Sequence, residues 1–243
     1  MQRDPCGCGV GLKFDFIIVH ESGHEWFGNN ISMKDAADMW IHEGFTNYSE
    51  NLFVEYYWGK EAGADYVIGS RKNIANAGPI IGTYGANREG SGDMYYKGGN
   101  MLHTIRQVIG NDTTWRAVLR GVQAKFAHQV VTGRQVQEYM SAHAGVDLHR
   151  VFEQYLTTTK VPVLEYRIDG PALTYRWANV VAGFDMPVAV LAGKGRSVRL
   201  APTEQWRTTD IGLAEPEDFR VDENYYVESK RVDAAPTATG ATP

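Results

Sequence analysis

The sequence predicts an α+β fold in which a mostly helical region, residues 1–159, is followed by a small all-β module, residues 160–232. Three observations lead to this prediction. Apolar residues recur at helical spacing through most of residues 16–156. The second region instead contains short runs rich in β-branched and aromatic residues, separated by turn signals. Between two of these runs stands Asp169-Gly170, a dipeptide typical of a β-hairpin.

Composition limits the kinds of partner that we expect. The chain has 243 residues, of which 43% are hydrophobic and 22% are charged. This length and hydrophobic share are enough to bury a substantial core. A formal net charge of -5 gives no global electrostatic reason to bind nucleic acid or an anionic membrane. No apolar run approaches the ~18 residues of a membrane-spanning helix. We therefore expect neither a nucleic-acid nor a membrane partner.

The first 13 residues are rich in glycine, and we expect a loop there. Cys6 and Cys8 stand one residue apart in this loop, without the second cysteine pair that a zinc site usually needs. A disulfide between residues this close would be strained, so we expect two unremarkable loop thiols. The segment lacks the apolar core of a signal peptide, and the compartment stays unassigned.

Helical patterns occupy the remainder of the first region. The first begins near Phe16, and Gly28-Asn29-Asn30 are residues that commonly end a helix. A later one opens with a capping-box pattern, in which Thr132 is followed three residues on by Gln135. The further helices are predicted over residues 37–57, 60–75, 93–109, 112–127, 132–144 and 148–156.

A long loop is predicted over residues 78–93, and six glycines fall between Gly82 and Gly99. Long irregular loops in compact domains are often functional, but a mobile surface loop accounts for this composition equally well.

The second region is predicted to consist of short strands. Residues 163–168 and 173–177 form the hairpin, and further strands are expected over residues 186–191, 197–200 and 224–228. Residues 234–243 contain only Ala, Pro, Thr and Gly, and we expect a disordered tail over residues 233–243.

The strongest chemical signal is His20-Glu21-Ser22-Gly23-His24, an H-E-x-x-H pattern on the first predicted helix. Residues four apart on a helix differ by about 40° in direction and about 6 Å along the axis, so both imidazoles can bind one metal ion. Zinc accepts histidine nitrogen readily and favours four ligands. Glu21 would stand beside the metal, where it can deprotonate a bound water.

A catalytic zinc site needs a third protein ligand and one open position. Glu43 can supply this ligand, because it lies on the next predicted helix, 19 residues after His24. The alternative is an ordinary carboxylate on a helix surface.

Together these residues resemble the gluzincin aminopeptidases, the aminopeptidase N family. The resemblance is strong over residues 10–110, and it includes the run HESGHEWFGN from His20, the setting of Glu43 in a Trp-x-x-Glu-Gly-Phe pattern, and the segment Tyr95-Tyr96-Lys97-Gly98. It implies a thermolysin-like catalytic lobe for residues 1–159 and one Zn²⁺ per chain, held by His20, His24 and Glu43.

The resemblance also implies a reaction. The chain would be a zinc metallopeptidase that hydrolyses peptide bonds and, when complete, removes N-terminal residues from peptides. Glu21 would be the catalytic base, and Tyr95 would donate a hydrogen bond to the transition-state oxyanion; otherwise Tyr95 is a packed or surface tyrosine. Asp38 and Asn29 lie in matching stretches and would orient the histidines; for Asn29, helix capping is an equal alternative. Bacterial relatives are often periplasmic or secreted.

One part of the family pattern is not found. The Gly-x-Met-x-Asn segment, which helps such aminopeptidases to grip the free α-amine of the substrate, is not present in residues 1–19. We therefore expect a fragment or an N-terminally truncated product, whose partner would be the missing N-terminal half of the same protein. Two alternatives remain open: an inactive zinc-binding fragment, and an endopeptidase of thermolysin type that cleaves N-blocked peptides.

Overall fold

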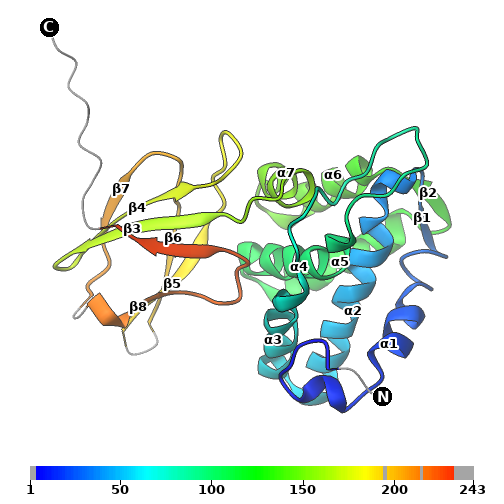
Figure 1. Cartoon of the computed structure of the whole chain (residues 1–243), viewed down its shortest axis with the longest axis horizontal. Coiled ribbons are helices and arrows are strands. Elements are labelled where there is room, and N and C mark those ends of the chain that lie inside the picture. The colour runs from blue at the N-terminus through cyan, green and yellow to red at the C-terminus, as the bar shows by residue number, and fades with distance from the viewer. Residues whose placement is uncertain (1–3, 194–195, 214–215, 233–243) are drawn as a thin grey trace, which may run out of the picture. The chain divides into compact units, whose positions relative to one another are not determined.

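The computed structural model describes residues 4–193, 196–213 and 216–232. It contains both helices and small sheets, so the predicted α+β class is confirmed (Figure 1). The chain divides into two compact units. The helical unit comprises Met1–Lys160 together with Glu223–Tyr226, and the β unit comprises Val161–Asp222 and the chain from Val227 onward. The predicted disordered tail lies outside the described residues.

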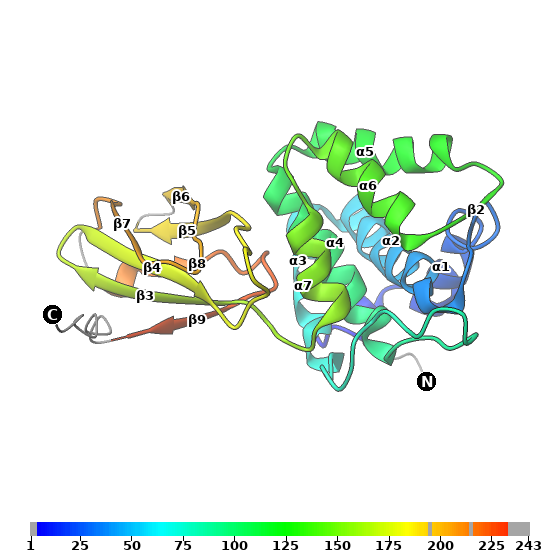
Figure 2. The same cartoon turned by 90° about the horizontal axis from the view of Figure 1, so that it is seen from above.

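Helix α2 is the central element of the helical unit, and it packs against α1, α3 and α4 (Figure 2). Its buried side includes Trp40, Ile41, Phe45 and Tyr48. The helices of this unit are α1 (Phe16–Gly23), α2 (Trp40–Trp58), α3 (Lys60–Gly69), α4 (Tyr96–Ile109), α5 (Asp112–Lys125), α6 (Gly133–Ala144) and α7 (His149–Thr157), with short 3₁₀ turns at Val10–Leu12, Ala36–Asp38, Ser70–Asn73 and Gly92–Met94.

Side-chain caps fix where several helices begin. Asp15 accepts a hydrogen bond from the backbone N–H of Ile17 at the start of α1. The predicted capping box of α6 is confirmed, because Thr132 accepts from the N–H of Gln135 while the Gln135 side chain accepts from the N–H of Thr132.

The first helix is shorter than predicted. It ends at Gly23, and the chain continues through turns to strand β1 (Ile31–Met33), which pairs in parallel with β2 (Gln129–Val131). This two-stranded sheet was not predicted, because three-residue strands carry too little alternation to stand out from turns. The pairing joins segments almost 100 residues apart in sequence, and it fixes the path of the segment that connects α1 to α2.

The glycine-rich loop over residues 78–93 is tied to the helices by its backbone. The N–H of Ile80 donates to the carbonyl of Leu156 at 3.0 Å, and the N–H of Gly82 donates to the carbonyl of Ala37 at 3.0 Å. Within the loop, the N–H of Ser91 donates to the carbonyl of Pro79 at 2.9 Å. The loop therefore follows a defined path between α3 and α4.

The expectation for the two cysteines is wrong, because Cys6 and Cys8 form a disulfide. Gly7 lies between them with φ of +66°, a left-handed conformation that glycine adopts without a steric penalty. The chain reverses there, so the two Cα atoms lie 5.2 Å apart, within the usual range for a disulfide.

The β unit contains two sheets. The first has the strand order β7-β4-β3-β9, and the second has the order β6-β5-β8. The predicted hairpin is confirmed as an antiparallel pair that runs from Val163 opposite Ala178 to Asp169 opposite Ala172. The strands are β3 (Val163–Asp169), β4 (Ala172–Ala178), β5 (Val188–Ala192), β6 (Ser197–Leu200), β7 (Arg207–Asp210), β8 (Phe219–Val221) and β9 (Glu228–Arg231), with a 3₁₀ turn at Pro216–Asp218.

The strand predicted over residues 224–228 is wrong. Residues Glu223–Tyr226 belong to the helical unit, and β9 begins only at Glu228, where it pairs in parallel with β3. Tyr225 and Tyr226 are buried, so their apolar pattern reflects packing in the helical unit and not a place in a sheet.

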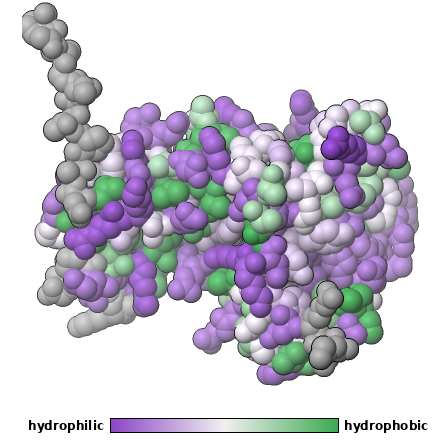
Figure 3. All heavy atoms as spheres, viewed as in Figure 1, coloured by the Kyte–Doolittle hydropathy of each residue, from purple (hydrophilic) through white to green (hydrophobic). Residues whose placement is uncertain are grey.

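Exposed apolar side chains occur on α1 and just before it. Leu12, Ile17 and Ile18 are each more than half exposed. Figure 3 shows hydrophobic surface close to the N-terminal segment. Among the described helices, none combines the length and the apolar character needed to cross a membrane.

Candidate metal centre

Helices α1 and α2 bring the three predicted metal ligands together. Nε2 of His20 lies 3.1 Å from Oε2 of Glu43, and Nε2 of His24 lies 3.6 Å from the same oxygen. The two imidazole rings are 5.1 Å apart between centroids and nearly perpendicular. His20 lies in the last turn of α1 and His24 is the residue that caps its C-terminal end, still in a helical backbone conformation, so the spacing of four residues keeps both imidazoles on one side. The first turn of α2 presents Glu43 to them.

Each histidine is oriented through its other ring nitrogen. Nδ1 of His20 lies 2.8 Å from Oε1 of Glu50, a carboxylate that is 1% exposed. Nδ1 of His24 lies 3.0 Å from the carbonyl oxygen of Phe27 and 3.2 Å from Oγ1 of Thr46. A carboxylate or carbonyl acceptor at Nδ1 fixes the tautomer and leaves Nε2 available to a metal.

The donor set fits a zinc ion. One ligand atom from each of His20, His24 and Glu43 lies within 4.8 Å of the others. Ligands about 2.1 Å from a tetrahedral zinc ion are about 3.4 Å apart, close to the two measured separations. Two imidazoles and one carboxylate also leave a fourth position open, which is the arrangement of catalytic zinc sites.

The electrostatic balance at His20 is unusual. Burial lowers the pKa of His20, but hydrogen bonds and negative charge from Glu43 and Glu50 outweigh burial and raise this pKa to about 9. A metal ligand must be a neutral imidazole, so a proton and a metal ion compete for Nε2 of this residue.

The ligands line a cleft of about 510 Å³ that is also bordered by Glu21, Glu50 and Tyr95. Glu21 is exposed and follows His20 directly on α1. The cleft is therefore accessible to a substrate from the side on which Glu21 lies.

Tyr95 reaches the cleft from the residue that precedes α4. Its ring centroid is 5.7 Å from that of His20. Burial and the negative charge of Glu43 raise the pKa of Tyr95, so its hydroxyl keeps its proton and can donate it in a hydrogen bond.

Close packing of α2 on α4 sets the position of Tyr95. A Cβ atom added to Gly98 would lie 2.9 Å from Cα of Gly44, so the two helices meet where neither residue has a side chain. Gly44 follows Glu43 directly, and Gly98 lies one turn after Tyr95. The contact therefore brings the tyrosine beside the ligand.

Two predicted supporting residues lie elsewhere. Asp38 accepts hydrogen bonds from the hydroxyl of Tyr84 and the N–H of Gly133, each at 2.8 Å. The Asn29 side chain donates to Glu25. Neither prediction of an orienting role is correct, because the acceptors at the histidines are Glu50 and Phe27.

Glu50 was not among the predicted residues, although its position in the sequence carries a signal. Glu50 follows Glu43 by seven residues, which is two helical turns, so both carboxylates lie on the same side of α2.

Comparison with known proteins gives consistent matches. The family model described as "Peptidase family M1 domain" matches residues 12–155. The chain is 26% identical over 169 residues to aminopeptidase N of Lactococcus lactis subsp. lactis, covering 63% of this chain and 19% of that protein. It is 27% identical over 132 residues to endoplasmic reticulum aminopeptidase 1 of Mus musculus, covering 50% of this chain and 14% of that protein.

A solved structure also matches, namely aminopeptidase A of Legionella pneumophila in complex with aspartic acid. The TM-score is 0.67 at 15% identity, and the match covers 96% of this chain and 28% of that one. At this identity the likeness shows the fold alone. The chain spans less than a quarter of the length of the curated relatives that it matches.

Proposed function

Because the chain belongs to peptidase family M1, we propose that it carries the metal centre of a zinc-dependent aminopeptidase, an enzyme that removes N-terminal residues from peptides. The observation that carries the proposal is the convergence of Nε2 of His20, Nε2 of His24 and a carboxylate oxygen of Glu43 in one cleft. The names of the relatives support the aminopeptidase class, and peptides are the proposed substrates.

The residues at the cleft have different roles in the proposed reaction. His20, His24 and Glu43 would hold the zinc ion, which when bound supplies a Lewis acid for the scissile carbonyl and the attacking water. Glu21 accepts the proton of that water and passes it to the leaving amine. The hydroxyl of Tyr95 donates a hydrogen bond to the oxygen of the tetrahedral intermediate.

The first test compares a free-amine peptide with its N-acetylated twin, each with and without a zinc chelator, and follows the products by mass spectrometry. Stepwise, chelator-sensitive loss of N-terminal residues from the free peptide alone is the expected result. Internal cleavage of both peptides would instead indicate an endopeptidase. No cleavage of either, with zinc still bound, would indicate a metal-binding fragment without its own activity.

The second test substitutes the proposed base. Glu21→Gln keeps the shape of the side chain but removes its ability to accept a proton, so turnover should fall by about 10²- to 10⁴-fold. Zinc content should stay at one ion per chain, as measured by elemental analysis, because Glu21 is not one of the three ligands. A variant that retains most of its activity would disprove the assignment of the base.

A further inference from the structure

A line of buried hydrogen bonds leads from the metal centre to helix α3. The hydroxyl of Tyr66 donates to Oε2 of Glu50 at 2.5 Å, while Oε1 of Glu50 lies 2.8 Å from Nδ1 of His20. Tyr66 is 2% exposed and Glu50 is 1% exposed. Burial and the charge of Glu50 raise the pKa of Tyr66, so its hydroxyl keeps its proton and acts as the donor.

Each oxygen of Glu50 therefore has its own role. Oε1 is shared by His20 and the side-chain amide of Asn47, at 2.8 and 3.2 Å. In the described part of the chain, Tyr66 is the donor to Oε2. A buried carboxylate that loses a donor is destabilised, and it can turn to find another partner. Such a turn would move the acceptor that orients His20.

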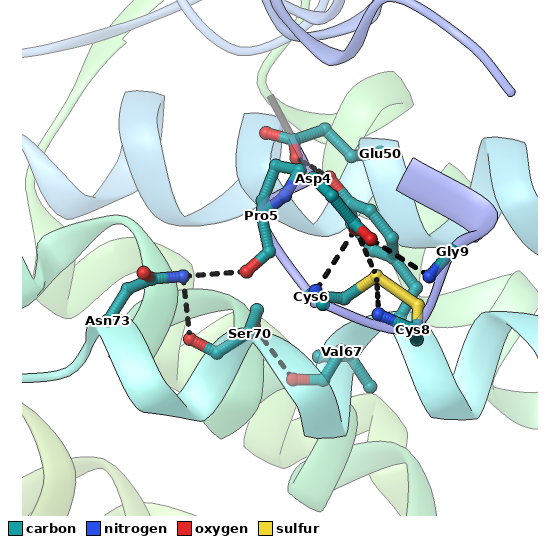
Figure 4. Close-up of a disulfide and its surroundings, with 11 residues drawn as sticks. Asp4, Pro5, Cys6, Cys8, Gly9, Glu50, Val67, Ser70 and Asn73 are labelled. Carbon is teal, nitrogen blue, oxygen red and sulfur yellow. Dashed lines mark hydrogen bonds between the residues drawn. A yellow bond between two sulfur atoms is a disulfide. The ribbon is translucent and has the colours of Figure 1, made fainter. Parts of the chain in front are cut away.

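The N-terminal loop packs directly on Tyr66. Cys6, Phe14, Val54 and Tyr66 form one buried apolar cluster, and the rings of Phe14 and Tyr66 are 5.6 Å apart between centroids. The side-chain amide of Asn73 donates to the carbonyl of Pro5 at 2.8 Å and attaches the loop to the 3₁₀ turn that follows α3. Figure 4 shows the disulfide loop together with Glu50 and Asn73.

The Cys6–Cys8 disulfide closes this loop, and it is accessible from one side. Cys6 is buried, whereas Cys8 is exposed. Asp4 accepts hydrogen bonds from the N–H groups of Gly7 and Gly9 at 3.0 and 2.8 Å. One of its carboxylate oxygens also lies 2.9 Å from Sγ of Cys6.

We propose that Tyr66 is a positioning residue for the metal ligand His20, acting through Glu50, and that the disulfide loop holds Tyr66 in place, so that reduction of Cys6–Cys8 weakens metal binding. This inference rests on the metal site of the proposed function. It makes the metal centre sensitive to the redox state of a loop that contributes no ligand to it.

The redox step needs an external dithiol as reductant. One of its thiolates attacks Sγ of Cys8, the S–S bond breaks, and Sγ of Cys6 leaves and takes up a proton. The second thiol of the reductant then displaces Cys8, so that the protein gains two thiols and the reductant becomes a disulfide. The new Cys6 thiol can donate to Asp4, in competition with the N–H of Gly7, which loosens the loop over Tyr66.

The first experiment measures zinc affinity by competition with a chromophoric chelator, in the full chain. Tyr66→Phe removes only the hydroxyl and should weaken zinc binding by about 10- to 100-fold. Tyr155→Phe is the matched control, because Tyr155 is also buried and its hydroxyl donates to the carbonyl of Tyr226 at 2.6 Å. This control should leave zinc affinity unchanged.

A spectroscopic measurement separates positioning from general destabilisation. In the Co²⁺-loaded chain, Tyr66→Phe should shift the visible absorption bands of the metal, whereas Tyr155→Phe should not. Equal zinc affinity and equal spectra for both variants would overturn the inference. If the wild type binds zinc no better than a His24→Ala variant, the proposed metal site itself is wrong and both proposals fail.

The second experiment tests the disulfide without adding thiols, which would themselves bind zinc. The double substitution Cys6→Ser, Cys8→Ser should weaken zinc binding in the wild-type background and have no further effect in the Tyr66→Phe background. Equal effects in both backgrounds, or no effect in either, would show that the disulfide loop does not act through Tyr66.

Discussion

Lys97 is a charged residue type in a fully buried position. It is 0% exposed, and its Nζ donates to the carbonyl oxygen of Thr158 at 2.8 Å. Burial lowers the pKa of Lys97 to about 8, although the negative charge of Asp93 opposes this shift. The folded chain therefore releases the Lys97 proton at a lower pH than the unfolded chain does.

This difference makes stability depend on pH in a defined direction. Between pH 8 and the ordinary lysine pKa of 10.5, the unfolded chain binds one proton more than the folded chain at this residue. The free energy of unfolding should therefore rise with pH there, by at most about 1.4 kcal/mol per pH unit. The Lys97→Met variant should lack this part of the pH dependence. Urea unfolding of the wild type and the variant, measured from pH 7 to pH 10.5, would show the difference. Parallel pH profiles would contradict the prediction.

Residue spacing predicted much of the metal centre but not its surroundings. Helix periodicity and ligand chemistry predicted His20, His24 and Glu43, and the structure brings these three side chains together. The match to peptidase family M1 confirms the family resemblance, whereas the roles of the three residues as metal ligands stay a prediction. Tyr66 could not be found in this way. Its contact with Glu50 depends on how α3 returns against α2, which local sequence patterns do not encode.

At the scale of elements, the crossing of α2 and α4 controls the geometry of the cleft. Every residue from Lys97 to Arg106 is buried, so α4 is packed on all sides. A displacement of this helix would therefore cost packing free energy. The close approach of Gly44 and Gly98 is the point of that crossing nearest to the metal centre.

Gly98→Ala should therefore impair catalysis more than metal binding. The added methyl group would stand 2.9 Å from Cα of Gly44, and it would push the start of α4, with Tyr95, away from the cleft. A displacement of about 1 Å at a catalytic group can cost on the order of 10²-fold in rate. Steady-state kinetics and zinc affinity should be measured together.

Gly92→Ala is the matched control for this crossing, because a methyl group added there meets nothing within 4 Å. It should behave as the wild type. Equal kinetics for the two variants would show that the crossing tolerates a side chain.

Helix positions were predicted well where periodicity and caps agree, as for α5 and α6. The ends were less accurate: the helix expected over residues 37–57 is a 3₁₀ turn followed by α2, and the helix expected to start at residue 93 starts at Tyr96. The interrupting turns are set by tertiary hydrogen bonds, such as that from the N–H of Ala75 to Asp93, and these have no local signature.

At the scale of the whole chain, the segment Glu223–Tyr226 completes the core of the helical unit. The N–H of Tyr226 donates to Oγ1 of Thr104 at 2.9 Å, and its carbonyl accepts from the hydroxyl of Tyr155 at 2.6 Å. Asn224 contributes a contact of 2.9 Å with Nε2 of His103. The helical unit is thus built from two stretches of sequence that are separated by most of the β unit.

Tyr226→Ala should consequently destabilise the helices, although this residue follows the β strands in sequence. Removing a buried aromatic side chain typically costs about 3–5 kcal/mol. Urea unfolding followed by circular dichroism at 222 nm reports mainly on helix and should show this loss. Tyr166→Ala, on strand β3 of the β unit, is the control and should leave the helical transition in place.

The return of the chain to the helical unit has a consequence for cleavage by proteases. Residues 161–222 leave the helical unit and come back to it, so both ends of this stretch are anchored in the same core. A single cut within residues 161–222 would yield two pieces, each of which holds part of that core. The pieces would stay associated after the peptide bond is broken, and the nicked protein would separate only under conditions that unfold the helices themselves.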